Sequence, residues 1–232
     1  MSTTNQRRLP QILVVTAVAV EQTAISEGIQ LTDYDAIIDI ITCGVGPAAA
    51  AAVTATAITK TNYDLIISAG IGGGFTIAPI GSIVISDVIV AADLGAEDGE
   101  NFIPVEQLGF GKNDYEVDTM FANHAGQALQ QANIQAIIAP IITVATATGS
   151  AKSANRWIQN IPNVAAEAME GSGVATAAQL ANIPVIEIRA ISNQVGPRDR
   201  SSWRITEALH TLKHTFCALA PLFDIQERRI EK

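Results

Sequence analysis

Two segments in the second half of the chain place polar side chains at the ends of apolar runs. Met169 is the last residue of the apolar run 164–169, and Glu170 follows it. Asn193 follows the apolar run 185–192. A carboxylate or an amide in such a setting costs free energy unless it has a partner, so packing alone does not account for these residues. A carboxylate accepts hydrogen bonds, and an amide both donates and accepts them. The pattern therefore predicts a polar binding site built from strand ends.

Three more candidate residues follow apolar runs in the same way. Glu21 comes directly after the run 12–20, and Thr148 and Gly149 come after the run 137–147. Ligands of open α/β sheets bind at the carboxyl ends of the strands, so Thr148 and Gly149 are candidate substrate-binding residues. The alternative for Glu21 is a solvent-exposed position in the first turn of a helix, where the helix dipole favours a carboxylate.

The string Gly70-Ile71-Gly72-Gly73-Gly74 directly follows the apolar run 65–69. Such glycines indicate that the backbone either approaches another group closely or adopts positive φ, and the simpler alternative is a tight turn. Because the string lies at a strand end, we include Ile71 and Gly72 among the candidate substrate-binding residues.

Strand-length apolar runs alternate along the chain with stretches of helical character. The runs cover residues 12–20, 36–43, 65–69, 83–91, 137–147, 164–169 and 185–192, and the helical stretches cover 47–60, 115–132, 150–159, 171–181 and 202–223. This alternation predicts an α/β fold. We expect three layers, in which helices cover both faces of a mostly parallel, mixed central sheet.

Length and composition predict a single domain. A chain of 232 residues with 48% hydrophobic and 16% charged residues can bury one large core. No linker, repeat or low-complexity block divides it, so we expect residues 1–232 to fold together. Residues 1–10 are expected to form a polar, loosely ordered N-terminal extension. Residues 93–114, polar and glycine-bearing, are expected to form a mobile surface loop that could border a pocket.

The charge balance and the hydropathy pattern exclude two classes of partner. Lys and Arg number 14 against 23 Asp and Glu, which gives a net charge of -9. A negative protein lacks the electrostatic attraction on which non-specific nucleic-acid binding depends, so we expect no DNA or RNA partner. The apolar runs are shorter than the roughly 18 to 20 residues of a membrane span, so we expect no membrane partner either.

The cysteines favour a reducing compartment. Cys43 and Cys217 are too few for a disulfide framework and have no metal-ligand spacing, so we expect a cytoplasmic protein without a metal. Arg7 and Arg8, followed by the run 12–20, imitate a signal peptide. A buried parallel strand explains that run equally well, and the alternating pattern downstream requires such a first strand.

One motif suggests a rival function. Gly44-Val45-Gly46-Pro47-Ala48-Ala49 fits the dinucleotide-binding fingerprint G-x-G-x-x-A between a strand and a helix. The fingerprint also needs an acidic residue at the end of the next strand, about twenty residues later. Asp64 is the residue at that distance, but it precedes its strand and so lies at the wrong end of the sheet. The sequence therefore disfavours a nicotinamide cofactor.

The segments 165–171 and 189–193 together resemble the ribose-binding and base-binding segments of the nucleoside phosphorylase and nucleosidase superfamily. The resemblance implies the nucleoside phosphorylase-like fold. It assigns Met169 to packing on the sugar, Glu170 to binding the ribose hydroxyls, and Glu21, after the first strand, to activating the attacking water. A carboxylate also offsets positive charge that grows on the sugar in an oxocarbenium-like transition state. One departure is Ala168, where methylthioadenosine/adenosylhomocysteine nucleosidases usually carry a second glutamate.

Asn193 stands where the adenine-specific nucleosidases of this superfamily have aspartate. A protonated aspartate can transfer a proton to the imidazole nitrogen of the purine, whereas an asparagine cannot act as an acid. The NH2 group of asparagine can instead donate hydrogen bonds to that nitrogen and to a neighbouring oxo group. Asn193 therefore favours hypoxanthine over adenine as the base, and its alternative role is to cap a turn.

The continuation 194–203 resembles the futalosine hydrolase branch of the superfamily. Futalosine is a hypoxanthine riboside whose sugar carries a chain that ends in a benzoate. Arg198, Arg200 or Arg204 could pair with that carboxylate, and Trp203 could stack on its ring. Ordinary surface arginines around a helix start are the alternative. The resemblance further implies a small nucleoside substrate, no cofactor, no metal and a homo-oligomer of two or more subunits.

We therefore expect an enzyme that hydrolyses the N-glycosidic bond of futalosine in menaquinone biosynthesis, with Glu21, Glu170 and Asn193 as catalytic residues. A purine nucleoside phosphorylase and a methylthioadenosine/adenosylhomocysteine nucleosidase are the enzyme alternatives. Phosphate needs arginines or backbone donors, and Lys60 is the only basic residue between Arg8 and Lys112. A nucleotide-binding sensor is the non-enzyme alternative, although a sensor has no use for a water-activating carboxylate.

Overall fold

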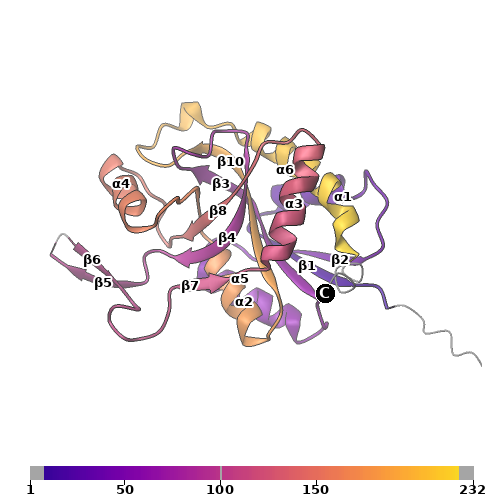
Figure 1. Ribbon diagram of the computed structural model, residues 1–232, viewed down its shortest axis with the longest axis horizontal. Coiled ribbons are helices and arrows are strands. Elements are labelled where there is room, and N and C mark those ends of the chain that lie inside the picture. Colours follow the sequence, from indigo (N-terminus) through magenta and orange to yellow (C-terminus); the bar gives the residue numbers. More distant parts are fainter. Residues whose placement is uncertain (1–7, 100, 225–232) are drawn as a thin grey trace, which may run out of the picture.

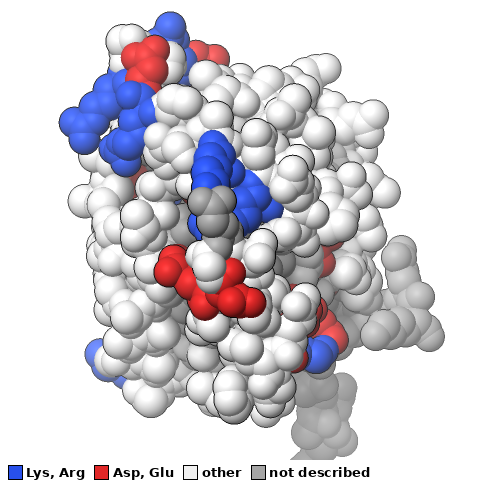
Figure 2. All heavy atoms as spheres, turned by 90° about the vertical axis from the view of Figure 1, so that its left-hand side faces the viewer, with Lys and Arg blue, Asp and Glu red and all other residues white. Residues whose placement is uncertain are grey.

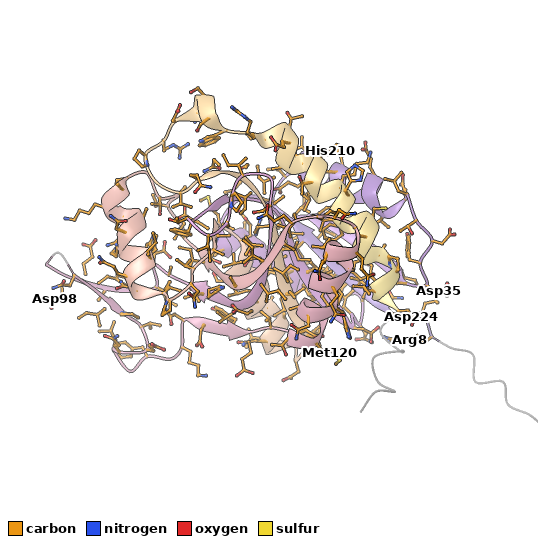
Figure 3. The ribbon with its side chains drawn as sticks, turned by 45° about the horizontal axis from the view of Figure 1, so that its top comes forward. Arg8, Asp35, Asp98, Met120, His210 and Asp224 are labelled. Carbon is orange, nitrogen blue, oxygen red and sulfur yellow. The ribbon has the colours of Figure 1, made fainter. Side chains whose placement is uncertain are left out.

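A computed structural model describes residues 8–99 and 101–224 (Figure 1). Most of the predicted N-terminal extension, residues 1–7, lies outside the described residues. Of its remainder, Arg8 pairs with Asp64 at 2.5 Å and Pro10 is buried. Arg8 and Asp224 lie on the same side of the molecule, and Asp98 lies on the opposite side (Figure 3).

The strands and helices alternate as the sequence predicts. The strands are β1 (Gln11–Thr16), β2 (Ile37–Thr42), β3 (Leu65–Gly74), β4 (Ile83–Ala91), β5 (Gly95–Asp98), β6 (Asn101–Pro104), β7 (Asp114–Glu116), β8 (Ala136–Thr143), β9 (Ala166–Ala168) and β10 (Val185–Gln194). The helices are α1 (Ala19–Ile29), α2 (Pro47–Ile58), α3 (Thr119–Gln131), α4 (Ala151–Asn160), α5 (Gly171–Leu180) and α6 (Ile205–Leu219), with short 3-10 turns at Arg200–Ser202 and Ala220–Phe223.

The central sheet is mixed and mostly parallel. Its strand order is β10-β4-β8-β9-β3-β1-β2, with β7 paired to β4 and an additional pairing of β10 with β3. The β1–β2, β1–β3, β10–β3, β4–β8 and β8–β9 pairs are parallel, and the β10–β4, β3–β9 and β4–β7 pairs are antiparallel. Because β10 joins both β3 and β4, part of the sheet closes on itself.

Helices cover the sheet on both sides, which confirms the predicted three-layer α/β fold (Figure 1). On one side α1, α3 and α6 pack over a large cluster of buried aliphatic and phenylalanine side chains, and on the other side α2 and α5 pack over a smaller cluster. Strands buried on both faces are the reason why the apolar runs of the sequence do not alternate with polar residues.

The first strand is shorter than the apolar run 12–20 predicts. β1 ends at Thr16, and α1 begins at Ala19. This helix is absent from the predicted helical stretches, although a helix start was the alternative considered for Glu21. The backbone N–H groups of Ala17 and Val18 donate to Glu21 Oε2 at 3.0 and 3.2 Å. A carboxylate that satisfies the free N–H groups of a helix start stabilises the helix there, so the strand stops although its residues remain apolar.

Two segments outside the predicted strands contain strands. Residues 70–74 continue β3, and none of these glycines has positive φ, so the alternative of a tight turn is wrong and the close approach of other groups explains the glycines. The segment 93–114 contains the β5–β6 hairpin, which projects from the body of the molecule (Figure 1).

No helix in residues 8–99 or 101–224 combines the length and the hydropathy that a membrane span requires.

Candidate active site

A cavity of about 400 Å³ lies beyond the C-terminal ends of β1, β3 and β10. Every predicted site residue except Gly149 lines it: Glu21, Ile71, Gly72, Thr148, Met169, Glu170, Asn193, Arg198 and Trp203. Gly149 lies just outside, where a methyl group would contact the Arg198 side chain at 3.7 Å. The volume is in the range of small-molecule sites, and the position is the one expected for ligands of open α/β sheets.

Glu21 lies in the first turn of α1 but points into the cavity rather than into solvent, and its side chain is buried. Its Oε2 accepts the N–H groups of the α1 start, and its Oε1 accepts the Ile71 N–H at 2.9 Å. Burial raises the pKa of this carboxyl above 4.5, while the Arg189 charge and the backbone donors act in the opposite direction. A buried carboxyl whose pKa is raised in this way is better suited to accept a proton than an exposed glutamate.

Glu170 precedes α5 and is also buried. Its Oε1 accepts the Gly46 N–H at 3.2 Å, and its Oε2 pairs with Arg189 Nη2 at 3.2 Å. Gly46 has φ +100, which only a glycine adopts without strain, so the turn before α2 is shaped to bring this N–H group to the carboxylate. Backbone and guanidinium together hold Glu170 at the cavity wall.

Arg189 is fully buried below the cavity floor and connects the carboxylates. Its Nε donates to Glu187 Oε1 at 2.8 Å, and its Nη2 contacts Glu170 and the Ser68 hydroxyl. Burial opposes the charge of Arg189, but Glu187, Glu170 and Glu21 outweigh that effect and raise its pKa. The guanidinium therefore stays charged and is engaged by the protein's own carboxylates.

The glycines of β3 make room for these side chains. A methyl group at Gly70 would overlap Glu21 Oε1 and lie 2.8 Å from Arg189 Nη1. At Gly72 it would lie 2.9 Å from the Glu167 carbonyl oxygen. The strand end is therefore built from glycine because charged side chains and a neighbouring backbone pass directly over it.

Asn193 reaches the cavity through a β-bulge. The register of β10 against β3 shifts between Ile191, opposite Gly72, and Asn193, opposite Gly73. Bulges next to active sites re-aim side chains, and this one turns Asn193 over the glycine floor. The Ser192 hydroxyl donates to Asn193 Oδ1 at 2.9 Å, and Asn193 Nδ2 donates to the Gln194 carbonyl at 3.1 Å. One amide hydrogen remains available for a ligand.

Glu167 is a cavity residue that the sequence did not single out. It is buried on β9 opposite Gly73, and its Oε1 accepts the Thr148 N–H at 2.8 Å. Its Oε2 accepts the Thr148 hydroxyl, which in turn accepts the Trp157 indole N–H at 2.9 Å. Burial raises the pKa of Glu167, and the Thr148 hydrogen bonds lower it. Thr148 is thus held in place by a carboxylate from the neighbouring strand.

Arg198 and Trp203 form the outer wall of the cavity. The Arg198 guanidinium carbon lies 5.3 Å from the centre of the Trp203 ring. Trp203 also borders a neighbouring open hollow of about 900 Å³, whose lining includes Arg200 and Arg204. Basic side chains gather at the top of the molecule in Figure 2, the end that carries the segment after β10 in Figure 1. Of the three candidate arginines, only Arg198 lines the cavity that holds the carboxylates.

The sequence contains a signal for three buried charged residues that were not among the predicted site residues. Glu167, Glu187 and Arg189 are charged residues inside the apolar runs 164–169 and 185–192. Charged residues are rarely fully buried unless they are paired, so a charge in the interior of a buried strand indicates a partner.

Among the described residues no group of three or more His, Cys, Asp or Glu side chains is arranged to hold a metal ion.

Comparison with known proteins gives the family. The model of the phosphorylase superfamily matches residues 36–220. A futalosine hydrolase of Streptomyces coelicolor is 43% identical over 231 residues, covering 92% of this chain and 96% of that protein, and one of Acidothermus cellulolyticus is 41% identical over 217 residues, covering 89% of each. The native structure of futalosine hydrolase of Helicobacter pylori superposes with a TM-score of 0.78 at 16% identity, covering 91% of this chain and 97% of that one.

The family model shows that the chain belongs to the phosphorylase superfamily, and the superposed structure has the same fold. The predicted resemblance is thereby confirmed, as is the nucleoside phosphorylase-like fold. Within the superfamily the chain belongs to the futalosine hydrolase family, and its enzyme class is that of the N-glycosyl hydrolases.

Proposed function

We propose that the protein cleaves the N-glycosidic bond of futalosine with water, releasing hypoxanthine and dehypoxanthine futalosine, as a step of menaquinone biosynthesis. The observation that carries the proposal is the lining of the cavity by Glu21, Glu167, Glu170 and Asn193. Carboxylates suit water, sugar hydroxyls and a cationic sugar ring, and an amide suits an oxopurine. Two relatives above 40% identity are futalosine hydrolases, which supports the same substrate.

In the proposed mechanism Glu21 accepts a proton from the attacking water, whose oxygen bonds to the anomeric carbon as the bond to the purine nitrogen breaks. Its raised pKa and its fixed position suit proton transfer. Glu170 accepts hydrogen bonds from the ribose hydroxyls and stabilises positive charge on the ring, while Met169 packs against the sugar. The electron pair of the broken bond leaves with the base.

Asn193 takes the role of binding the departing base. Ser192 occupies its carbonyl oxygen and the Gln194 carbonyl takes one of its two amide hydrogens, which leaves one N–H for an acceptor of hypoxanthine. The anionic base leaves with hydrogen-bond support from this amide and takes its proton from solvent or from Glu21. Ile71, Gly72 and Thr148 complete the walls around the purine and the sugar.

We assign the benzoate end of the substrate to Arg198 and Trp203. The guanidinium can pair with the carboxylate, and the indole can stack on the aromatic ring. Arg200 and Arg204 face the adjoining hollow and so lie further from the carboxylates that hold the sugar. Gly149, next to Arg198, lies outside the cavity and has no assigned contact.

Hydrolysis is favoured over phosphorolysis by the charges around the cavity. A phosphate would meet the carboxylates of Glu21, Glu167 and Glu170, and the buried Arg189 is already engaged by Glu187 and Glu170. Lys60 lines a different hollow, beside Asp39 and Tyr63. An anionic nucleophile would therefore face repulsion where a neutral water does not.

We further propose that the protein is a cytoplasmic homo-oligomer. Val18 and Val45 line the cavity yet are 40% and 59% exposed, and Val20 beside them is 57% exposed. Apolar side chains grouped at the mouth of a site suit coverage by a second subunit. Light scattering of the purified protein should give at least twice the mass of the 24.4 kDa chain. Cys43 and Cys217 are both free, which is compatible with a reducing compartment.

The experiment that tests the function is incubation of the purified protein with futalosine in phosphate-free buffer, followed by chromatography of the products. We expect stoichiometric hypoxanthine and dehypoxanthine futalosine at a rate that added phosphate does not change. Cleavage only in the presence of phosphate would show a phosphorylase. Preferred cleavage of methylthioadenosine would show the adenine-specific alternative, and tight binding without cleavage would show a sensor.

A further inference from the structure

Glu187 is a buried carboxylate that no step of the proposed reaction uses. It lies in the middle of β10, has no exposed surface, and is opposite Ser68 of β3. Its Oε1 accepts Arg189 Nε at 2.8 Å, but its Oε2 has no hydrogen-bond partner among the described residues. A buried carboxylate oxygen without a partner is costly, so this residue calls for a role beyond packing.

Glu187 and Arg189 are two residues apart on one strand, so their side chains lie on the same face of the sheet. The two-residue spacing lets the carboxylate reach the Nε edge of the guanidinium and leaves the two Nη atoms directed toward the cavity floor. There Nη2 contacts Glu170 and Ser68, and Nη1 lies 3.5 Å from the Ile71 carbonyl oxygen. The direction of the guanidinium is therefore set by Glu187.

Gly171 explains how the carboxylate fits. A methyl group at this position would overlap both Oε atoms of Glu187. Gly171 is the first residue of α5, whose positive N-terminal end favours a negative charge beside it. Glu187 thus fills the space that Gly171 leaves open, and it ties the start of α5, which carries Glu170, to Arg189.

The charged groups around the Glu187–Arg189 pair come from three elements. Arg189 lies on β10, Glu170 precedes α5, and Glu21 lies on α1. The neighbouring hydroxyl groups are those of Ser68 on β3, which contacts Arg189, and Ser86 on β4, which accepts the Glu187 N–H at 2.9 Å. The Arg189 guanidinium is thus the positive charge shared by Glu187, Glu170 and Glu21, and Glu187 binds its Nε edge.

We propose that Glu187 is a positioning residue for glycosidic-bond cleavage: it fixes the Arg189 guanidinium so that its remaining edge orients Glu170 and sets the charge that Glu21 experiences. The proposal rests on the proposed function, because Glu170 and Glu21 matter only if they bind the sugar and activate the water. It separates two contributions of Glu187, its hydrogen bond to Arg189 and its negative charge.

Glu187→Gln isolates the charge. Its amide oxygen still accepts Arg189 Nε, so the guanidinium keeps its direction, but its positive charge is less neutralised. More of that charge then acts on Glu21 and lowers the Glu21 pKa. We expect kcat/KM to remain within about tenfold of the wild type, while the acid limb of the pH profile moves to lower pH. The matched control is Ser86→Ala, which removes the backbone support of Glu187 and should leave the acid limb in place.

Glu187→Val combined with Gly171→Ala removes both contributions, and the added methyl group fills the space that the carboxyl leaves. The pair leaves the buried Arg189 Nε without its acceptor, so we expect a lower melting temperature, and the kinetics are compared at a temperature at which circular dichroism shows both proteins folded. Because Arg189 is then free to turn, we expect kcat/KM to fall about 10²-fold, mainly through kcat. Wild-type kcat/KM in this folded double variant would overturn the proposal.

A readout that does not depend on turnover separates this proposal from the proposed function. The side-chain carboxyl of Glu21 can be titrated by ¹³C NMR in the wild type and in Glu187→Gln. A lower Glu21 pKa in the variant supports the coupling through Arg189 even if futalosine is not the substrate. Identical titrations in the two proteins would refute the coupling even if futalosine is hydrolysed.

Discussion

The carboxylates around the cavity are chemically alike, but their surroundings differ. Glu21 accepts three backbone N–H groups and faces Arg189 from a distance, whereas Glu170 pairs directly with that arginine. A directly paired carboxylate remains a hydrogen-bond acceptor, and a buried carboxyl with a raised pKa can exchange a proton. This difference in environment supports the proposal that Glu170 binds the sugar and Glu21 activates the water.

Glu21→Gln tests the water-activating role. Glutamine keeps the volume of the side chain but cannot accept a proton, so we expect turnover to fall roughly 10² to 10⁴-fold while the affinity for futalosine changes little. Steady-state kinetics with a separate binding measurement on the variant distinguish these effects. Near-normal turnover would remove Glu21 from the mechanism.

Asn193→Asp tests the recognition of the base. An aspartate can be protonated and can accept from an exocyclic amine, so the variant should prefer the aminofutalosine analogue that carries adenine. Mismatched polar groups in a site can change discrimination by about 10⁴-fold. The ratio of kcat/KM for the two substrates measures the change, and Asn193→Ala, which should slow both reactions, serves as the control. An unchanged ratio would contradict the role given to this amide.

At the scale of elements, the site depends on how closely β3 lies to its neighbours. Arg189 of β10 is opposite Gly70, and the Asn193 bulge is opposite Gly73. A side chain on this strand end would occupy the space of Glu21, Arg189 or Asn193. The packing of the site therefore requires the glycine string. Glycines lose more backbone entropy on folding than other residues do, and the hydrogen bonds of β3 to β1 and β10 offset that loss.

Gly70→Ala tests that requirement. The added methyl group overlaps Glu21 Oε1, so we expect the variant to displace Glu21 and Arg189 and to lose about 10²-fold or more in kcat/KM. Gly126→Ala, on α3 and away from the cavity, is the matched control and should keep full activity. Equal activity of the two variants would show that Gly70 does not constrain the site.

The sequence predicted the elements better than their ends. Residues 19–29 were missed as a helix because the buried stripe of α1 includes Glu21 and Gly28, which break its apolar pattern. Asn193 and Glu170 could be predicted because each follows an apolar run. The role of Glu187 could not, because it depends on Gly171, sixteen positions earlier, and only the folded sheet brings the two together.

For the whole molecule, the buried carboxylates make the free energy of unfolding depend on pH. Burial raises the pKa values of Glu21, Glu167 and Glu187 above 4.5 in the folded protein. Between 4.5 and those raised values the folded protein binds more protons than the unfolded chain does. The free energy of unfolding must therefore decrease as the pH rises through this window.

We expect urea denaturation to give a larger free energy of unfolding near pH 5 than near pH 8, where each unit of raised pKa costs about 1.4 kcal/mol. Glu187→Gln should flatten this dependence, because it removes one of the buried carboxyls. Asp199→Asn is the control: Ser201 lowers the pKa of the exposed Asp199, and solvent screens that interaction, so the slope should not change. Stability that increases from pH 5 to pH 8 would mean that the site holds these carboxylates ionised at little cost.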